Sequence, residues 1–306
     1  MRRDWLALLV LASGCGRTGF DVHVPMVDTD ASTDGSGDAA GPCASWTAFG
    51  VPQALPGPIQ SASDDWFPTP SADELTLWFY STRGGDDDLY VATRASIADA
   101  FSAAVRVDEL ATAASEAGPT VTADELHMVF SRDGLPERAL FETLRSTRGD
   151  LWGAPIEILA IHEAGQNDYD PFLSPDGLRL VFVSKRTGTY MLFEATRPSI
   201  GATFGAPAEL VELGVAQSPT LSSDGLEIMF ASTRTPTVGA HDLWRARRPA
   251  LDQPFAAPTH VDELATPMDE FGLRLSYDGA TLYLNDATNL AGGANSSLDV
   301  TTRQCP

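Results

Sequence analysis

The chain is poor in basic residues and in cysteine, and both shortages narrow the classes of function open to it. It has 20 Lys and Arg against 42 Asp and Glu, which gives a formal net charge of −22. Phosphate backbones and anionic lipid headgroups are bound by clustered Lys and Arg. We therefore expect no nucleic acid partner and no docking of the protein surface on a membrane. Only 3 cysteines are present, and none form a paired metal-binding motif.

Motifs of several enzyme classes are also missing. There is no Gly-x-Ser-x-Gly nucleophile elbow and no glycine-rich phosphate loop. His162-Glu163 is not followed by the second histidine of a zinc protease helix, and no Asp-x-Asp-x-Asp-Gly calcium loop occurs. We therefore expect no cofactor, with Ca²⁺ as an open alternative because clustered carboxylates can supply its oxygen ligands.

The apolar run near the start, residues 6–12, is too short to span a bilayer. It follows Met1-Arg2-Arg3 and precedes Ala12-Ser13-Gly14 and Cys15, the order typical of a secretory signal. The stretch resembles a bacterial lipoprotein signal, which is cut before a cysteine whose thiol is then acylated. This predicts a signal peptide over residues 1–14 and lipidation at Cys15. An ordinary signal peptide with an incidental cysteine is the alternative.

Residues 15–42 contain mostly Asp, Gly, Ser, Thr and Ala and too few large apolar side chains to bury a core. We interpret them as the lipidated cysteine and a disordered linker, which would span roughly 30 Å. The folded domain is then residues 43–306, held in the bacterial envelope by the lipid anchor and either periplasmic or surface-exposed.

A repeat of about fifty residues runs through this domain. Each unit holds a Pro-containing segment, an Asp-Glu or Asp-Gly turn, an alternating strand and a third strand that ends at an arginine. A fourth segment then begins at an aromatic residue. Four short strands per unit are typical of a propeller blade. The turns are at Asp73, Asp124, Asp176, Asp224 and Asp278, the arginines are Arg94, Arg145, Arg197, Arg247 and Arg303, and the aromatics are Phe49, Phe101, Trp152, Phe204 and Phe255.

The order of the segments predicts how the ring closes. The fourth-strand segment at Phe49 has no strands before it, and the last unit, ending at Arg303, has no fourth strand after it. We therefore expect an all-β, five-bladed β-propeller in which the N-terminal strand completes the last blade and removes the free edges. Repeat alignment places Cys43 and Cys305 at neighbouring points of one connection, which predicts a disulfide worth on the order of 3–5 kcal/mol.

The repeat resembles that of TolB-type, WD-repeat-like β-propellers over residues 46–303. The motif that carries the resemblance is Ser174-Pro-Asp-Gly177 with Phe182 and Arg186, and Asp88-Leu-Tyr90 matches the third strand. The resemblance implies the propeller fold. It implies little about activity, because propellers host many functions.

Acidic and aromatic residues recur where the first strand of each unit begins and where its second strand ends. We predict that these loops meet at one mouth of the central channel and form a ligand face. Its residues would be Asp64, Asp65, Trp66, Asp87, Glu116, Asp168, Tyr169, Asp170, Arg186, Arg234, Asp269, Glu270 and Asp286.

Two functions are open for this face. The first is a non-catalytic binding or scaffolding module, a monomer whose partner is a protein, peptide or glycan. The second follows from a resemblance to arabinanase-type five-bladed propellers, which hydrolyse glycosides with channel carboxylates. In that case Asp65, Glu116 and Asp168 would be the catalytic residues, whereas the first function requires none.

Overall fold

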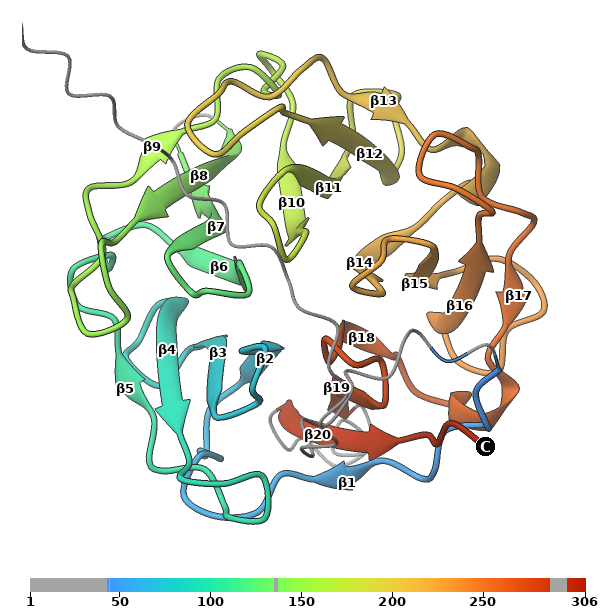
Figure 1. Cartoon of the computed structure of the whole chain (residues 1–306), viewed down its shortest axis with the longest axis horizontal. Helices are drawn as coiled ribbons and strands as arrows, with labels where there is room; N and C mark the ends of the chain where they lie inside the picture. Colours follow the sequence, from blue (N-terminus) through green and yellow to red (C-terminus); the bar gives the residue numbers. More distant parts are fainter. Residues whose placement is uncertain (1–42, 44, 135–136, 287–295) are drawn as a thin grey trace, which may run out of the picture. The chain divides into compact units, whose positions relative to one another are not determined.

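The computed structural model describes residues 43, 45–134, 137–286 and 296–306, and these form five four-stranded antiparallel sheets around one axis (Figure 1). Blades one to four each contain four consecutive strands, and blade five combines the last three strands with the first, in the order β1-β20-β19-β18. The predicted five-bladed propeller, closed by the N-terminal strand, is confirmed. The predicted signal peptide, the lipidation at Cys15 and the linker to residue 42 lie outside the described residues.

The innermost strand of each blade is followed outward by second and third strands of six or seven residues and by a two-residue outer strand. Blade one holds β2 (Asp65–Pro70), β3 (Thr76–Ser81), β4 (Asp88–Thr93) and β5 (Val105–Arg106). Blade two holds β6 (Glu116–Val121), β7 (His127–Asp133), β8 (Arg138–Leu144) and β9 (Ile156–Glu157). Blade three holds β10 (Asp168–Leu173), β11 (Arg179–Ser184), β12 (Met191–Thr196) and β13 (Ala208–Glu209). Blade four holds β14 (Gln217–Leu221), β15 (Glu227–Ser232), β16 (Asp242–Arg247) and β17 (Thr259–His260). Blade five holds β18 (Phe271–Leu275), β19 (Thr281–Asp286), β20 (Ser297–Thr302) and β1 (Gln53–Ala54), and the 3-10 helices η1 (Val211–Leu213) and η2 (Asp262–Leu264) precede β14 and β18.

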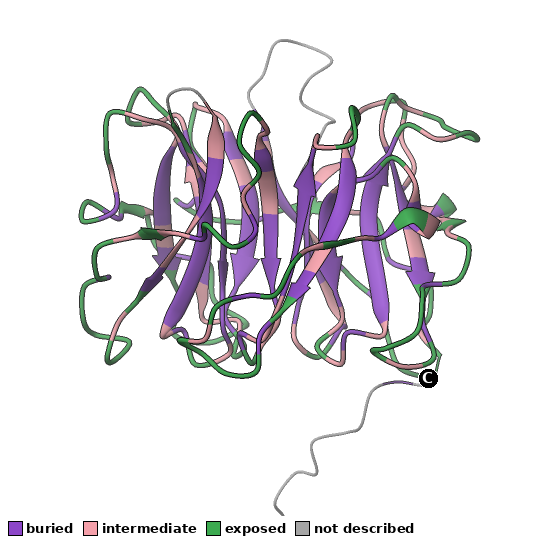
Figure 2. Cartoon of the chain, turned by 90° about the horizontal axis from the view of Figure 1, so that it is seen from above, coloured by how far each residue is buried: buried purple, intermediate pink, exposed green. Residues whose placement is uncertain are grey.

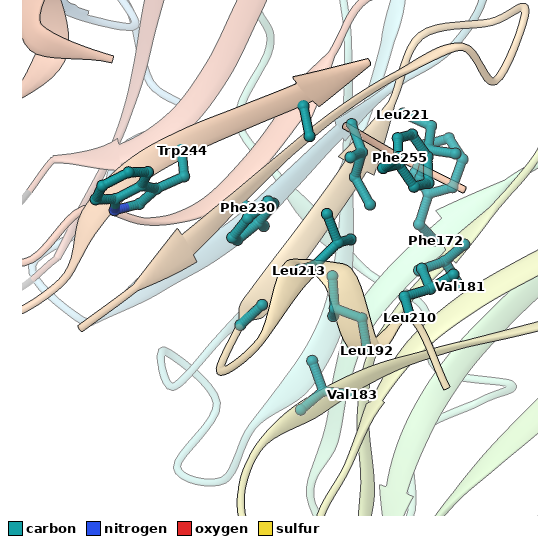
Figure 3. Close-up of a cluster of buried hydrophobic side chains, with 13 residues drawn as sticks. Phe172, Val181, Val183, Leu192, Leu210, Leu213, Leu221, Phe230, Trp244 and Phe255 are labelled. Atoms are coloured by element: carbon teal, nitrogen blue, oxygen red, sulfur yellow. The ribbon is translucent and has the colours of Figure 1, made fainter. Parts of the chain in front are cut away.

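Five hydrophobic clusters hold the blades together, and each cluster spans one blade interface. The cluster drawn in Figure 3 joins Val181 and Leu192 of blade three to Phe230 and Trp244 of blade four. The cluster at the closure joins Phe79 of blade one to blade five. Because alternating residues of a strand face opposite sides of its sheet, each blade presents an apolar surface to both neighbours. The ring therefore has no uncovered blade face.

The predicted turns between the first and second strands are present in all five blades. In each, the Asp side chain accepts a hydrogen bond from the hydroxyl two residues before it and from the backbone N–H two residues after it, as Asp176 does from Ser174 and Leu178. The next residue is in the left-handed region, at Glu74, Glu125, Gly177, Gly225 and Gly279. Asp-Gly is therefore favourable here because glycine adopts a positive φ without strain. Blades one and two place a glutamate in the same left-handed conformation.

A repeated arginine–aromatic contact explains the spacing between the third and fourth strands. The guanidinium of Arg94 lies 4.4 Å from the ring centroid of Phe101, and four equivalent pairs follow. They are Arg145–Trp152, Arg197–Phe204, Arg248–Phe255 and, across the closure, Arg303–Phe49. The predicted strand end at Arg247 in blade four is confirmed, since Arg247 is the last residue of β16, but Arg247 is half exposed and the next residue, Arg248, makes the contact with the aromatic ring.

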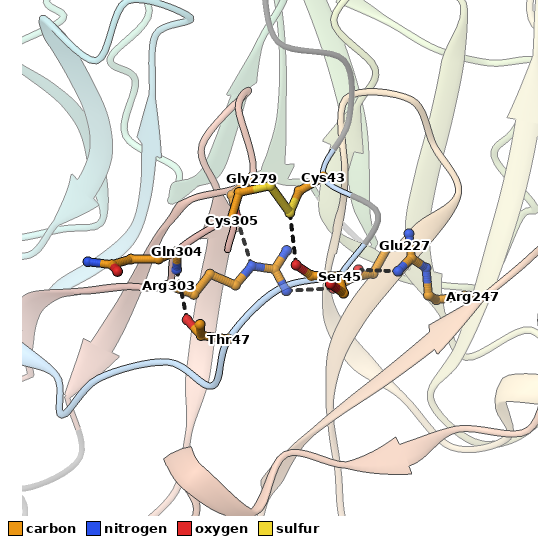
Figure 4. Close-up of a disulfide and its surroundings, with 9 residues drawn as sticks. All are labelled: Cys43, Ser45, Thr47, Glu227, Arg247, Gly279, Arg303, Gln304 and Cys305. Carbon is orange, nitrogen blue, oxygen red and sulfur yellow. Dashed lines mark hydrogen bonds and ion pairs between the residues drawn. A yellow bond between two sulfur atoms is a disulfide. The ribbon is translucent and has the colours of Figure 1, made fainter.

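The N- and C-terminal ends of the domain meet beside this contact (Figure 4). Cys43 and Cys305 form the predicted disulfide, with Cα atoms 5.7 Å apart. Arg303 also pairs with Glu227 of blade four at 3.0 Å, and Gln304 accepts the N–H of Thr47 at 2.9 Å through its backbone carbonyl. The closure is thus covalent and hydrogen-bonded. Among the described residues, no helix is long and apolar enough to cross a membrane.

Candidate functional site

The strands run between two faces of the ring (Figure 2). We call the face at which the inner strands begin the entry face; it also carries the loops between second and third strands. We call the opposite face the hairpin face, because the turns between first and second strands lie there. Cys43, Cys305 and the C-terminus lie at the hairpin face, since β20 runs from Ser297 opposite Asp286 to Thr302 opposite Thr281.

Every inner strand is bulged near the entry face. The register shifts at the same place in all five, and one residue of each bulge has a positive φ. Glycine adopts this conformation freely, but three blades place other residues there, and such strain clusters at functional sites. The five residues are Phe67, Gly118, Asp170, Ser218 and Gly272.

Side chains of neighbouring blades bind the N–H groups of two bulges. Asn285 Oδ1 accepts the N–H of Phe67 at 2.9 Å, and Asp170 Oδ2 accepts the N–H of Ser218 at 3.1 Å. Burial raises the pKa of Asp170, which the Ser218 hydrogen bond and the positive charges of Arg274 and Arg138 oppose. At Gly272 an added Cβ would lie 1.9 Å from Asn285 Oδ1, so glycine is required. The bulges at Phe67 and Ser218 are therefore held by hydrogen bonds between blades.

A single arginine crosses the centre of the ring. Arg274 of β18 is 2% exposed, and its guanidinium donates to the carbonyls of Pro219 and Pro171 and to Thr69 Oγ1. Thr69 in turn donates to the carbonyl of Pro119 at 2.6 Å. The inner strands are edge strands whose axial carbonyls have no ladder partner, and these bonds satisfy such carbonyls in three of the five blades, at Pro119, Pro171 and Pro219. Burial lowers the pKa of Arg274 to about 10, so it is charged at neutral pH.

On the hairpin face, two pockets open beyond this arginine. One is the axial pocket, which reaches Arg274 and is crossed by Tyr277, whose hydroxyl donates to the carbonyl of Val121 at 2.9 Å. The other lies between blades three and four and is lined by Arg179, Arg197 and Leu251, among others. Both are lined by residues of the hairpin face, and Arg274 lies between the axial pocket and the predicted ligand face.

The first carboxylates of three inner strands lie in buried ion pairs. Asp65, Glu116 and Asp168 have fully buried side chains, and each contacts an arginine of its own blade: Arg83 at 2.6 Å, Arg132 at 2.8 Å and Arg186 at 3.0 Å. Each guanidinium also donates to a backbone carbonyl and stacks on aromatic rings of the second and third strands. The three predicted catalytic candidates are thus bound within their blades.

The other two blades each keep only one member of this ion pair, the arginine in blade four and the carboxylate in blade five. In blade four Ala216 replaces the carboxylate, and Arg234 donates to the backbone carbonyls of Leu213 and Val215 instead. In blade five Glu270 is present and 4% exposed, yet no described group donates to its Oε2. Burial raises the pKa of Glu270 to about 7, and the nearby charges of Asp242 and Asp269 add to that rise.

Partly exposed aromatic and charged side chains gather on the entry face. The rings of Tyr169 and Tyr190 meet edge to face at 5.9 Å, and the Lys185 ammonium lies 4.1 Å from the Tyr190 centroid. His241 packs on Phe271 at 4.3 Å. Such aromatic surface with polar edges is typical of binding sites for peptides and sugars.

Charged residues of blades one and two complete this surface. Burial raises the pKa of Asp87, with a further contribution from the negative charges of Asp133 and Asp64, whereas Arg138 opposes the rise. Arg138 pairs with Asp133 and lies 5.6 Å from the ring centroid of Tyr169. Perturbed titrating groups on one surface favour a functional interpretation.

The predicted face residues therefore have different surroundings. Asp64 and Asp269 bind loop backbone N–H groups, of Ser296 and His241 respectively. Asp286 ends β19 opposite Ser297. Trp66, Asp87, Tyr169 and Asp170 are partly exposed at the entry face, whereas Asp65, Glu116, Asp168, Arg186, Arg234 and Glu270 belong to the ion-pair positions.

Several face residues were missed in the sequence, namely Phe67, Tyr80, Arg138, Tyr190, His241 and Phe271. Repeat alignment offers a signal for Tyr80. The equivalent residues of blades three and four are Val183 and Ala231, so a tyrosine with its polar hydroxyl departs from the pattern at this position. Among the described residues, no three His, Cys, Asp or Glu side chains are grouped so as to hold a metal ion. The Ca²⁺ alternative stays a prediction.

No protein-family model matches the sequence, and no curated protein matches it. Solved structures share the fold. TolB from Acinetobacter baumannii superposes with a TM-score of 0.51 at 14% identity, covering 80% of this chain and 56% of the TolB chain. A putative TolB from Agrobacterium tumefaciens gives 0.52 at 17% identity, covering 85% and 92%. The α-L-arabinofuranosidase PaAbf62A from Podospora anserina gives 0.58 at 12% identity, covering 85% and 97%.

These similarities confirm the predicted resemblance to TolB-type propellers at the level of the fold. The chain spans little more than half the length of the Acinetobacter TolB. At such low identity the similarities establish a shared fold and nothing about activity.

Proposed function

We propose that this protein is a non-catalytic envelope lipoprotein whose propeller binds a partner through the entry face. The observation that carries the proposal is the gathering there of strained bulges, partly exposed aromatic rings and charged groups with raised pKa values. A protein, peptide or glycan partner suits aromatic surface with charged and polar edges.

The position of the chain ends supports the entry face as the binding surface. Cys43, which the linker would reach first, lies with Cys305 at the hairpin face. A lipid anchor at Cys15 would therefore attach to the domain on the side opposite the entry face. The entry face is then free to meet a protein, peptide or glycan in the envelope.

The glycoside hydrolase alternative is favoured by the fold of the arabinofuranosidase and weakened by the carboxylates. A retaining or inverting glycosidase needs one carboxyl as acid and another as base or nucleophile, both reaching the sugar. Here Asp65, Glu116 and Asp168 have fully buried side chains and contact arginines. Each of these carboxylates is therefore already paired with an arginine of its own blade.

Two assays on the purified domain separate these functions. Glycan and peptide arrays probed with wild type should give ligands whose binding is lost in Asp87→Asn/Tyr169→Ala, while the hairpin-face control Arg179→Ala binds as wild type does. Incubation with arabinan and arabinoxylan should give no release of sugar. Turnover that disappears in Glu116→Gln, with folding retained by circular dichroism, would establish the hydrolase instead.

A further inference from the structure

An open groove of about 400 Å³ lies on the hairpin face between blades three and four. Phe172 and Leu221, two side chains of the hydrophobic cluster in Figure 3, form its buried side. Its rim carries the exposed turn residues Asp176 and Ser223 and the side chain of Leu251, which is 46% exposed. The volume is within the range of ligand sites. The groove therefore offers space for a ligand and an opening to solvent.

At the equivalent place between blades one and two, an arginine bridges the two hairpin turns. Arg148 of blade two pairs with Asp73 of the blade-one turn, 3.0 Å from its Oδ2. The same guanidinium donates to the backbone carbonyls of Ala123 and Asp124 in the turn of its own blade. One carboxylate and two carbonyls of adjacent turns are thus the acceptors of a guanidinium here.

Blade four lacks this arginine. Repeat alignment matches Arg148 to Leu251, because each follows by three residues the arginine that contacts the fourth-strand aromatic. Leu251 lies against Gly225, where an added Cβ would be 2.8 Å from the leucine Cδ2. Gly225 also replaces Glu125, a second carboxylate that Arg148 contacts. An aliphatic side chain and a glycine therefore leave the groove open where blade two has an ion pair.

The other acceptors are kept between blades three and four. Asp176 corresponds to Asp73, and both use Oδ1 for the hydrogen bonds of their turns. Oδ2 of Asp176 is therefore the counterpart of the oxygen that accepts Arg148. Ser223 and Asp224 correspond to the residues whose carbonyls Arg148 contacts. In the part of the chain that the structure describes, no group donates to Asp176 Oδ2 or to these two carbonyls.

A proline explains why the two turns do not hydrogen-bond to each other directly. Between blades two and three, the backbone N–H of Ala123 donates to the carbonyl of Pro175 at 2.9 Å. Between blades three and four the donor position is Pro175 itself, which has no N–H. The carbonyl of Ser223 cannot be satisfied in this way, so it is available to an external donor.

The charges around the groove suit a cation. Arg179 and Arg197 line it, but each pairs with a glutamate, at 2.7 and 2.9 Å respectively. Asp176 and Asp224 accept hydrogen bonds within their turns and have no basic partner among the described residues. The net charge of −22 also favours a basic partner.

We propose that this groove binds the guanidinium of an arginine side chain presented by a basic polypeptide. The guanidinium would donate to Asp176 Oδ2 and to the two turn carbonyls of blade four, as Arg148 does to their counterparts. Its aliphatic stem would lie along Leu251. A planar group with several fixed donors matches these acceptors better than an ammonium ion does. The groove is on the hairpin face, so this second binding site is independent of the function proposed for the entry face.

The test is a ¹H–¹⁵N NMR titration of the full chain with the capped peptide acetyl-Gly-Arg-Gly-amide. Its control ligand carries citrulline, which keeps the shape of arginine without its charge. We expect the arginine peptide to shift the amide signals of Gly225 and Leu251 saturably and the citrulline peptide to leave them unmoved. Because Asp176 is exposed to solvent, Asp176→Asn should weaken binding by about fivefold.

Two further variants make the test specific to the groove. Asp278→Asn makes the same change in the blade-five turn, where Asp278 accepts the same two hydrogen bonds, and should bind as wild type does. Leu251→Arg places a guanidinium within the chain at the position that Arg148 has in blade two. It should abolish peptide binding, because the new side chain would occupy the same acceptors.

Equal binding by Asp176→Asn, retained binding by Leu251→Arg, or unmoved Gly225 and Leu251 signals in folded wild type at about 10 mM peptide would overturn the proposal. Asp87→Asn/Tyr169→Ala should bind the arginine peptide as wild type does, and a loss there would mean that the peptide binds the entry face instead. Melting curves of each variant establish that the folded protein is being compared.

Discussion

Blades one to three and blade five use the same structural position for opposite purposes. Asp65, Glu116 and Asp168 bind arginines and so fasten the entry loop of each blade to the loop between its second and third strands. Glu270 keeps the burial and the threonine contact but has no arginine. A repeat protein can differentiate one blade by removing a partner rather than by adding a group, because the remaining half of the pair is already buried and positioned.

Blade five is distinguished in other ways as well. It supplies Arg274 to the centre of the ring, Tyr277 to the hairpin-face pocket, and both the first and last strands of the domain. The predictions below separate the structural contributions of this blade from the functional one.

The largest effect is expected at the centre. Replacing Arg274 with Met removes donors from the carbonyls of Pro171 and Pro219 and from Thr69, and leaves these buried acceptors unsatisfied. The free energy of unfolding should fall by about 4 kcal/mol. Urea unfolding followed by tryptophan fluorescence measures this, and a loss below about 1 kcal/mol would show that the central bonds are not required.

Removing the disulfide should have the next largest effect. The Cys43→Ser/Cys305→Ser variant loses the link between chain ends 262 residues apart. Its free energy of unfolding should fall by about 3 kcal/mol, mainly because the unfolded chain gains freedom. Wild type under reducing conditions should show the same loss. Unchanged stability in both would mean that the Arg303–Phe49 and strand contacts close the ring alone.

The paired and unpaired carboxyls should respond differently to neutralisation. Asp168→Asn leaves Arg186 without its carboxylate and should destabilise the protein by about 2 kcal/mol at pH 8. Glu270→Gln removes an unpaired buried charge and should be neutral or stabilising by about 1 kcal/mol. Unfolding of both variants in parallel gives the comparison, and equal destabilisation would show that Glu270 has a partner.

A further effect, no larger than that of Asp168→Asn, is a pH dependence carried by Glu270. Its pKa is raised from 4.5 to about 7 on folding, so the folded state holds the proton more strongly than the unfolded state. Its contribution to stability is therefore complete below pH 4.5 and is lost as the pH rises to 7, by about 2 kcal/mol. The difference between wild type and Glu270→Gln across this range isolates the effect, and a difference independent of pH would exclude it.

Most of the fold was predictable from the sequence because its signals are local and recur. Each Asp turn and each aromatic anchor has contacts within its own blade, so five copies of one pattern indicated five blades and the closing strand. The predicted disulfide followed from the same alignment. In blade four two arginines are adjacent at the strand end, and the seven-residue interval to the aromatic, kept by Arg248 and Phe255, identifies the one that contacts the ring.

The candidate site was less predictable because it depends on the direction of side chains. Repeat position correctly placed acidic residues at the start of the inner strands, but it could not tell that Asp65 faces Arg83 whereas Asp170 faces Ser218 of the next blade. The bulges decide this, and they have no strong sequence signature when Phe67 or Asp170 occupies the left-handed position. That Glu270 Oε2 has no described hydrogen-bond donor becomes visible only when its oxygens are compared with those of Glu116, which accept a hydrogen bond from Arg132.

The most direct test of this difference is an NMR titration of the side-chain carboxyl of Glu270, with ¹³C-labelled glutamate and Glu270→Gln for assignment. The account predicts a midpoint near pH 7, because the carboxyl is buried and lies near the negative charges of Asp242 and Asp269. A midpoint near 4.5 would contradict it.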